Sequence, residues 1–177
     1  MTTTNLPGPA DVAAARATIA PYIRRTPLLR AEVDGRPLLL KLEHLQRSGS
    51  FKLRGALTAL LNGDRPEHVV TASGGNHGLG VATAAGLLGL PATVYVPHTV
   101  PETKARRIEE TGARLIRHGD TYADAAAAAT AAAAGPGARY LPAYDHPDVI
   151  AGQGTVAAEV IEEAPDVDAV AVAVGGG

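Results

Sequence analysis

The sequence predicts an α/β fold in which mainly parallel strands form sheets covered by helices on both faces, giving three layers. Short apolar runs alternate with helical patterns along most of the 177 residues. This alternation is typical of repeated strand–helix units whose strands run parallel. The runs contain few polar residues, as expected for strands buried on both faces. With 46% hydrophobic and 19% charged residues, the chain also has the composition of a globular protein with a sizeable core.

The N-terminal part departs from this alternation. A helix is expected at 11–23, followed by strands at 28–32 and 38–42. Asp34 and Gly35 lie between the two strands, and a short turn of these residue types favours a hairpin. This is the one antiparallel element that the sequence predicts.

The remaining elements are expected in strict alternation, beginning with a helix. Helices are predicted at 52–61, 77–88, 102–111, 123–134 and 149–163, and strands at 68–72, 93–96, 114–117, 139–141 and 169–174. Gly89 and Gly112 are stop signals after the second and third of these helices. The fourth helix is dominated by alanine, which has the highest helix propensity, and Asp120 or Thr121 can cap its N-terminus.

Charge and residue content exclude several classes of function. Lys and Arg number 16 against 18 Asp and Glu, which leaves a net charge of −2 and no basic patch for nucleic acid. The chain has no cysteine, so thiol nucleophiles, disulfides and iron–sulfur clusters are excluded, and a cytoplasmic location is expected. No apolar run reaches the roughly 18 residues of a membrane helix, and no signal peptide or membrane partner is expected. The six histidines show no metal-ligand spacing, so no metal site is predicted.

Lys52 is the strongest candidate for catalysis. It opens a predicted helix after the small residues Gly49 and Ser50, beside Phe51, at a strand-to-helix junction. Ligands of parallel sheets collect at such junctions, whereas most lysines are solvated surface charges.

A second signal lies at the end of the sequence. Gly175, Gly176 and Gly177 follow the apolar run at 169–174. The amides of such a loop can bind an anion such as phosphate. A lysine able to form a Schiff base, together with a phosphate loop, suggests pyridoxal phosphate as the cofactor.

Residues 73–78, Ser-Gly-Gly-Asn-His-Gly, form a third candidate between an apolar strand and a helix. The two adjacent glycines permit a tight turn with exposed amides, and the helix N-terminus adds partial positive charge. Ser73 and Asn76 supply a hydroxyl and an amide for a carboxylate or a cofactor oxygen. The alternative is that these are ordinary turn and cap residues. His77 is expected to be structural, because no residue near it in sequence orients its ring.

Together these motifs resemble those of the serine/threonine dehydratase (threonine ammonia-lyase) family, which are pyridoxal-phosphate enzymes of fold-type II, the tryptophan-synthase-β-like fold. The resemblance covers nearly the whole chain, and several long motifs in the same order are more specific than any one of them. It rests on residues 25–28, KLEHLQRSGSFKLRGA at 41–56, TASGGNHGLGV at 71–81, VPHTVPETKARRIEETG at 96–112, HPDVIAGQGT at 146–155, and the glycines at 175–177.

The resemblance implies roles for individual residues. Lys52 would hold the cofactor as a Schiff base and act as the base, and Phe51 would pack near the pyridine ring. Asn76 would bond the phenolic oxygen of the cofactor. The phosphate would be bound by Gly175, Gly176 and Gly177. The substrate carboxylate would be held by Ser73, Gly74, Gly75, Asn76 and His77, with Ser73 also in the catalytic set.

The implied reaction is the deamination of L-threonine or L-serine, in which loss of water and hydrolysis give 2-oxobutanoate or pyruvate and ammonia. The usual state of the family is a homodimer. Serine racemase is a close rival, since it shares the motifs but places a second, serine base where this chain has Gly74. Glycine has no group to carry a proton, so the sequence favours elimination. Tyr144 is also similar to the aromatic residue that dehydratases place at this point.

The resemblance further implies a division into domains. Residues 1–52 would belong to a large domain, 53–145 would form a small α/β domain, and 146–177 would start the C-terminal part of the large domain. Members of the family continue well past the glycine loop, so the chain is expected to be a truncated, N-terminal portion. A noncatalytic fragment that needs a complement is therefore the alternative hypothesis.

Overall fold

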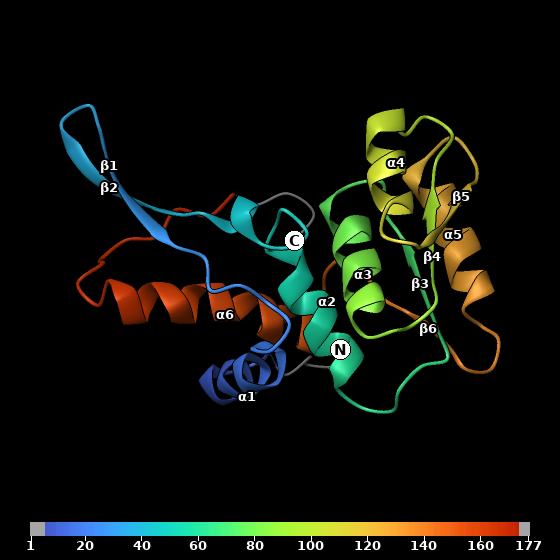
Figure 1. Ribbon diagram of the computed structural model, residues 1–177, viewed down its shortest axis with the longest axis horizontal. Coiled ribbons are helices and arrows are strands. Elements are labelled where there is room, and N and C mark those ends of the chain that lie inside the picture. The colour runs from blue at the N-terminus through green and yellow to red at the C-terminus, as the bar shows by residue number, and fades with distance from the viewer. Residues whose placement is uncertain (1–5, 174–177) are drawn as a thin grey trace.

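A four-stranded parallel sheet organises the right-hand body of the protein in Figure 1, a computed structural model that describes residues 6–173. The strand order is β5-β4-β3-β6. The strands are β3 (His68–Ala72), β4 (Ala92–Val96), β5 (Arg114–Arg117) and β6 (Ala138–Tyr140). Parallel neighbours need crossover connections, and the helices of the alternating sequence provide them.

Helices cover both faces of this sheet, which confirms the three-layer prediction. Helices α3 (Asn76–Leu87) and α4 (Glu102–Glu109) lie on one side of the strands and α5 (Tyr122–Ala132) lies on the other (Figure 1). Successive residues of a strand point to opposite faces. Accordingly, Val69 joins the main core, and its neighbour Val70 packs with Ala129 of α5.

The N-terminus of the alanine-rich helix α5 has the predicted cap. The hydroxyl of Thr121 accepts a hydrogen bond from the Asp124 amide at 3.2 Å. In return, the Asp124 carboxylate accepts one from the Thr121 amide at 2.9 Å. These reciprocal bonds form a capping box and show that Thr121, rather than Asp120, is the cap.

Helix α2 (Lys52–Leu61) lies between α3 and α6 (Pro147–Glu163), and α1 (Pro9–Ile19) packs against α6. The backbones of α2 and α6 touch where two glycines meet. A Cβ atom on Gly152 would lie 2.6 Å from the Arg54 carbonyl oxygen, and one on Gly55 would lie 2.7 Å from the Val149 carbonyl oxygen. Only glycine permits this approach, which anchors the helix that carries Lys52.

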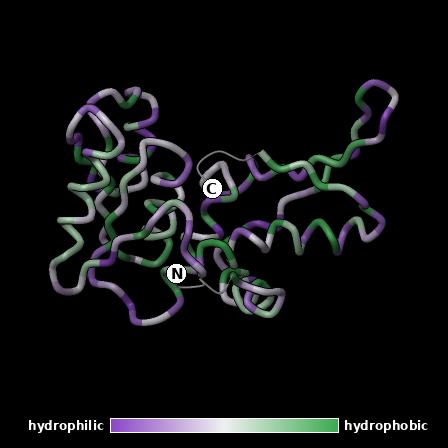
Figure 2. Tube along the Cα trace, turned by 180° about the vertical axis from the view of Figure 1, so that it is seen from behind, coloured by the Kyte–Doolittle hydropathy of each residue, from purple (hydrophilic) through white to green (hydrophobic). Residues whose placement is uncertain are grey.

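The predicted hairpin is present as β1 (Leu28–Val33) and β2 (Arg36–Lys41), paired antiparallel. Asp34 and Gly35 have φ angles of 52° and 72°, as the two central residues of a type I′ turn require. The hairpin projects from the rest of the chain (Figure 1). Figure 2 shows apolar residues in both strands and in the segment after α6. Leu29 and Leu40, which pair across the hairpin, are both exposed.

Two sequence predictions are wrong. Helix α1 spans Pro9–Ile19 instead of 11–23, because Pro21 has no amide proton to continue it. The strand predicted at 169–174 is absent over 169–173, where Val170 and Val172 are 68% and 72% exposed. A strand needs a neighbour for its backbone hydrogen bonds, and no strand of residues 6–173 pairs with this segment. The other predicted elements agree with the structure to within two residues at each end.

Between the hairpin and α2 lies a short helix that the sequence did not predict, η1 (Glu43–Leu45). None of the helices formed by residues 6–173 combines the length and the apolar character that crossing a bilayer requires.

Candidate functional site

Lys52 is the first residue of α2, and its side chain is partly buried. Its ammonium donates a hydrogen bond to the Ala143 carbonyl oxygen at 2.9 Å. The Phe51 ring centroid lies 5.3 Å from the same nitrogen. Burial lowers the pKa of Lys52, because desolvation disfavours the charged form. A larger fraction of this amine is therefore neutral and nucleophilic than of a solvated lysine.

The structure brings Lys52 close to the second candidate stretch, residues 73–78. Helix α3 begins in that stretch and packs its backbone directly on α2. A Cβ atom on Gly80 would lie 3.2 Å from the Lys52 Cβ and 3.1 Å from the Leu53 amide nitrogen. The charge of Lys52 also lowers the pKa of His77, after burial. The two stretches therefore belong to one site.

The turn from β3 to α3 has the predicted tight geometry. The Ser73 hydroxyl accepts a hydrogen bond from the Gly75 amide at 3.2 Å. A Cβ atom on Gly78 would lie 2.0 Å from the Ser73 carbonyl oxygen, so only glycine fits there. Asn76, the first residue of α3, is exposed. The first-turn amides of a helix have no partner within the helix and are suited to an anion such as a carboxylate.

His77 is buried and bonded to the protein. Its Nε2 lies 3.0 Å from the Thr71 hydroxyl and 3.1 Å from the Leu141 carbonyl oxygen. Thr71 donates its own proton to the Leu141 carbonyl at 2.8 Å, so the network assigns the ring proton to Nε2. Burial lowers the pKa of His77 to about 4, and the charge of Lys52 adds to that effect. A neutral ring that ties α3 to the end of β6 supports the structural interpretation.

The loop between β6 and α6 supplies the acceptor that sequence reasoning missed. The Ala143 carbonyl bonds Lys52, and two residues later Asp145 has a φ angle of 53°, in the left-handed region. A backbone acceptor leaves no signal in residue type. Tyr144, which lies between these two residues, hydrogen-bonds Tyr122, whose pKa is raised to about 12 by burial and by its tyrosine neighbours.

A pocket of about 320 Å³ opens beside the turn. It is lined by Gly74, Gly75, Asn76, Leu79, Lys104, Arg107 and Ile108. Sequence reasoning did not assign Lys104 and Arg107, although they lie one helical turn apart in the motif at 96–112. Their positive charges favour an anionic ligand at the N-terminus of α3.

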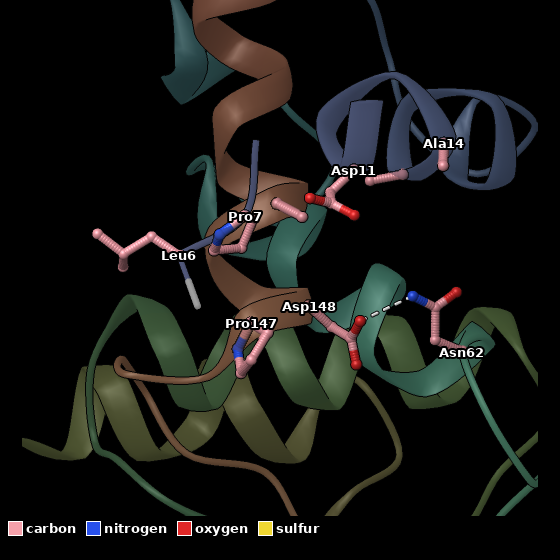
Figure 3. Close-up of a pocket in the computed structure, with 9 residues that line it drawn as sticks. Leu6, Pro7, Asp11, Ala14, Asn62, Pro147 and Asp148 are labelled. Atoms are coloured by element: carbon pink, nitrogen blue, oxygen red, sulfur yellow. Dashed lines mark hydrogen bonds between the residues drawn. The ribbon is translucent and has the colours of Figure 1, made fainter. Parts of the chain in front are cut away.

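A second pocket, of about 220 Å³, lies away from Lys52 between α1, α6 and the end of α2 (Figure 3). Its polar groups bond one another or a helix end. Asn62 donates to the Asp148 carboxylate at 2.8 Å, and the Asp11 carboxylate accepts the Gly8 amide at 2.7 Å. Both carboxylates have structural roles in these contacts.

The predicted phosphate-binding residues, Gly175, Gly176 and Gly177, lie outside the described residues. Within 6–173, no group of three His, Asp or Glu side chains is arranged to hold a metal ion. The described part of the site therefore consists of Lys52 with Phe51, the turn at 73–76, and the Ala143 carbonyl.

Comparisons with known proteins agree with this geometry. Residues 19–177 match the family described as "Pyridoxal-phosphate dependent enzyme". The chain is 40% identical over 174 residues to L-threonine ammonia-lyase of Thermotoga maritima, which covers 94% of this chain and 43% of that protein. It is 42% identical over 162 residues to L-threonine ammonia-lyase of Geobacter sulfurreducens, which covers 88% of this chain and 40% of that protein.

Solved structures share the fold. A threonine deaminase from the organism abbreviated T.th. has a TM-score of 0.84 and 40% identity, covering 90% of this chain and 52% of that one. Maize serine racemase has a TM-score of 0.85 and 32% identity, covering 90% and 50%. The chain thus spans about half the length of the proteins that it matches.

Proposed function

Because this chain belongs to the pyridoxal-phosphate dependent enzymes, we propose that it forms the lysine-bearing part of an ammonia-lyase acting on L-threonine, L-serine or both. The reaction removes water, and hydrolysis then gives 2-oxobutanoate or pyruvate and ammonia. The relatives named L-threonine ammonia-lyase support this choice of reaction. The observation that carries it is the partly buried Lys52 amine beside the first turn of α3.

The residues present fit the cofactor. The Lys52 amine is poised for covalent attachment, since burial lowers its pKa. Phe51 is adjacent to it, with the ring centroid 5.3 Å from Nζ, and Asn76 has an exposed amide for an oxygen of the ring. When bound, pyridoxal phosphate supplies an electron sink that stabilises negative charge at the substrate Cα.

The chain's own groups then orient the substrate and move its proton. The turn at 73–76 and the first-turn amides of α3 hold the carboxylate, and Lys104 and Arg107 add positive charge beside them. A fixed carboxylate directs the Cα proton towards the Lys52 amine, which takes it as general base. The Ala143 carbonyl accepts a hydrogen bond from the same nitrogen and holds it at the site.

Serine racemase is the second candidate, since maize serine racemase shares the fold. Elimination is favoured because Gly74 has no hydroxyl that could serve as a second base. A Cβ atom at this position would lie 2.4 Å from Val100 Cγ2, so a serine requires Val100 to move. No other residue of the turn at 73–76 replaces the missing group at position 74.

The alternative that these residues act only with a complementing polypeptide also has support. The chain spans 43% of the first relative, and Val170 and Val172 are exposed where a strand was predicted. We retain as proposals the division at residues 52/53 and 145/146, the phosphate-binding role of 175–177, a homodimer and a cytoplasmic location.

The test adds pyridoxal phosphate to the purified chain and records the visible absorbance band of a lysine-bound cofactor, with Lys52→Ala as control. L-threonine and L-serine follow, and 2-oxo acid is measured. A second arm adds the part of the Thermotoga maritima enzyme that lies beyond the matched region. A Lys52-dependent band and 2-oxo acid in either arm support the proposal. A band that survives Lys52→Ala, or an absence of 2-oxo acid in both arms, contradicts it.

A further inference from the structure

Arg54 is a charged residue whose side chain is 0% exposed. All five of its N–H donors are used. Its Nε and Nη2 bond the Glu43 carboxylate at 3.0 and 2.8 Å. Its Nη1 and Nη2 bond the Glu159 carboxylate at 2.7 and 3.0 Å. The second proton of Nη1 is donated to the Thr155 hydroxyl at 3.2 Å.

A second cation completes the cluster. Lys41 Nζ lies 2.6 Å from Glu159 Oε2, and the Thr26 hydroxyl donates to Glu43. The side chains of Lys41, Glu43 and Glu159 are 9%, 12% and 4% exposed. Two acids and two bases from β2, η1, α2 and α6 thus balance one another in the interior. We call Lys41, Glu43, Arg54 and Glu159 the buried ion cluster.

The cluster keeps its charges near neutral pH. Burial opposes the charged form of Glu159, but hydrogen bonds from Arg54 and Lys41 outweigh it and lower the pKa of Glu159. For Arg54, burial acts to lower the pKa, but hydrogen bonds to Glu159 and Glu43 raise it.

Stability alone does not account for such a cluster. Apolar residues of similar volume often stabilise a protein as well as a buried ion pair does, because burying charges costs desolvation energy. What the cluster adds is direction. A guanidinium that bonds two carboxylates in forked geometry accepts one orientation, whereas an apolar contact accepts many.

That orientation concerns the turn of helix that carries Lys52. Residues two apart on a helix point to nearly opposite sides, so Arg54 grips η1 and α6 while Lys52 reaches the Ala143 carbonyl. We infer that Arg54 is a positioning residue: its double fork to Glu43 and Glu159 fixes the rotation of the first turn of α2 that holds the Lys52 amine at the site. The inference rests on the proposed function only in taking Lys52 as the cofactor-binding group.

Two variants separate positioning from stability. The first replaces the whole buried ion cluster by apolar residues (Lys41→Met, Glu43→Leu, Arg54→Met, Glu159→Leu), so that no charge is left unpaired. The second, Arg54→Lys, keeps the charge and loses the fork. Arg16→Met, in the more exposed pair of Arg16 with Glu162, is the matched control.

The readout is the reactivity of the three lysines, Lys41, Lys52 and Lys104. Acetic anhydride labels neutral amines, and mass spectrometry of the peptides gives the pH midpoint for each lysine. Attachment of pyridoxal phosphate to Lys52 is then measured after borohydride reduction. Thermal unfolding is followed in parallel to show that each variant is folded.

In the parent chain and in Arg16→Met, we expect Lys52 to react with a lower midpoint than Lys104. In the folded apolar variant and in Arg54→Lys, the Lys52 midpoint moves up to that of Lys104, and cofactor attachment falls by about tenfold or more. A folded variant that keeps the parent's Lys52 midpoint overturns the inference. If the apolar variant does not fold, Arg54→Lys decides by the same criterion. Since labelling needs no cofactor, a failure of the proposed function is seen separately, as loss of attachment in the parent chain.

Discussion

Gly152→Ala tests the close crossing of α2 and α6 that anchors Lys52. The added Cβ would lie 2.4 Å from the Thr58 hydroxyl oxygen, 2.6 Å from the Arg54 carbonyl oxygen and 2.8 Å from the Gly55 Cα. Two of these atoms are backbone and cannot turn aside as a flexible side chain does. The helices must therefore move apart.

The size of the effect follows from two opposing contributions. Overpacking of this kind costs about 1–3 kcal/mol, and more where backbone must move. Replacing glycine by alanine inside a helix returns about 0.5–1 kcal/mol. We expect a net loss of about 2 kcal/mol, which lowers the unfolding midpoint by about 4–8 °C for a chain of this size.

Gly86→Ala is the matched control, because it lies inside α3 and its Cβ would meet only the Thr111 carbonyl oxygen at 3.5 Å. It gains the same propensity without the clash, so the midpoint should rise by about 1–4 °C. Thermal unfolding followed by circular dichroism compares the two. Equal midpoints for Gly152→Ala and Gly86→Ala would refute the close crossing.

Three further changes have defined outcomes. Thr121→Ala removes the cap of α5 and should cost about 1 kcal/mol in denaturant unfolding, whereas Thr130→Ala, within the same helix, should not destabilise; equal losses would contradict the capping box. His77 has a folded pKa of about 4, below its unfolded value of about 6.5, so the unfolded state binds its proton first as pH falls. Stability is full above about pH 6.5 and is lost by about 3 kcal/mol down to pH 4; this loss should shrink in His77→Gln, and an unchanged pH profile would count against the buried neutral ring. Gly74→Ser should lower the unfolding midpoint by displacing Val100, and an unchanged midpoint would show that Val100 yields freely.

Local signals predicted most of the fold. The type I′ turn at Asp34 and Gly35 was readable because its φ angles demand these residue types. The cap at Thr121 and the apolar strands of the sheet are local patterns of the same kind. The strand predicted at 169–174 failed because pairing is not local: an apolar run states a preference for burial but does not supply a neighbour.

The site divides in the same way. Lys52 and the turn at 73–78 carry residue types that suggest their chemistry, and the structure brings them together. The Ala143 carbonyl has no such signature, since every residue has a carbonyl. Arg54 was part of a recognised motif, but its burial depends on Glu43 and on Glu159, 105 residues away in sequence.

The central claim is that Lys52 is the lysine that binds the cofactor. The most direct measurement reduces the chain with borohydride in the presence of pyridoxal phosphate and maps the modified peptides by mass spectrometry. The three lysines differ in environment: Lys104 is exposed, Lys41 is bonded within the buried ion cluster, and Lys52 is partly buried beside the turn. We predict modification concentrated at Lys52 and lost in Lys52→Ala without transfer to the other two. Modification spread according to exposure, with Lys104 dominant, would contradict the account.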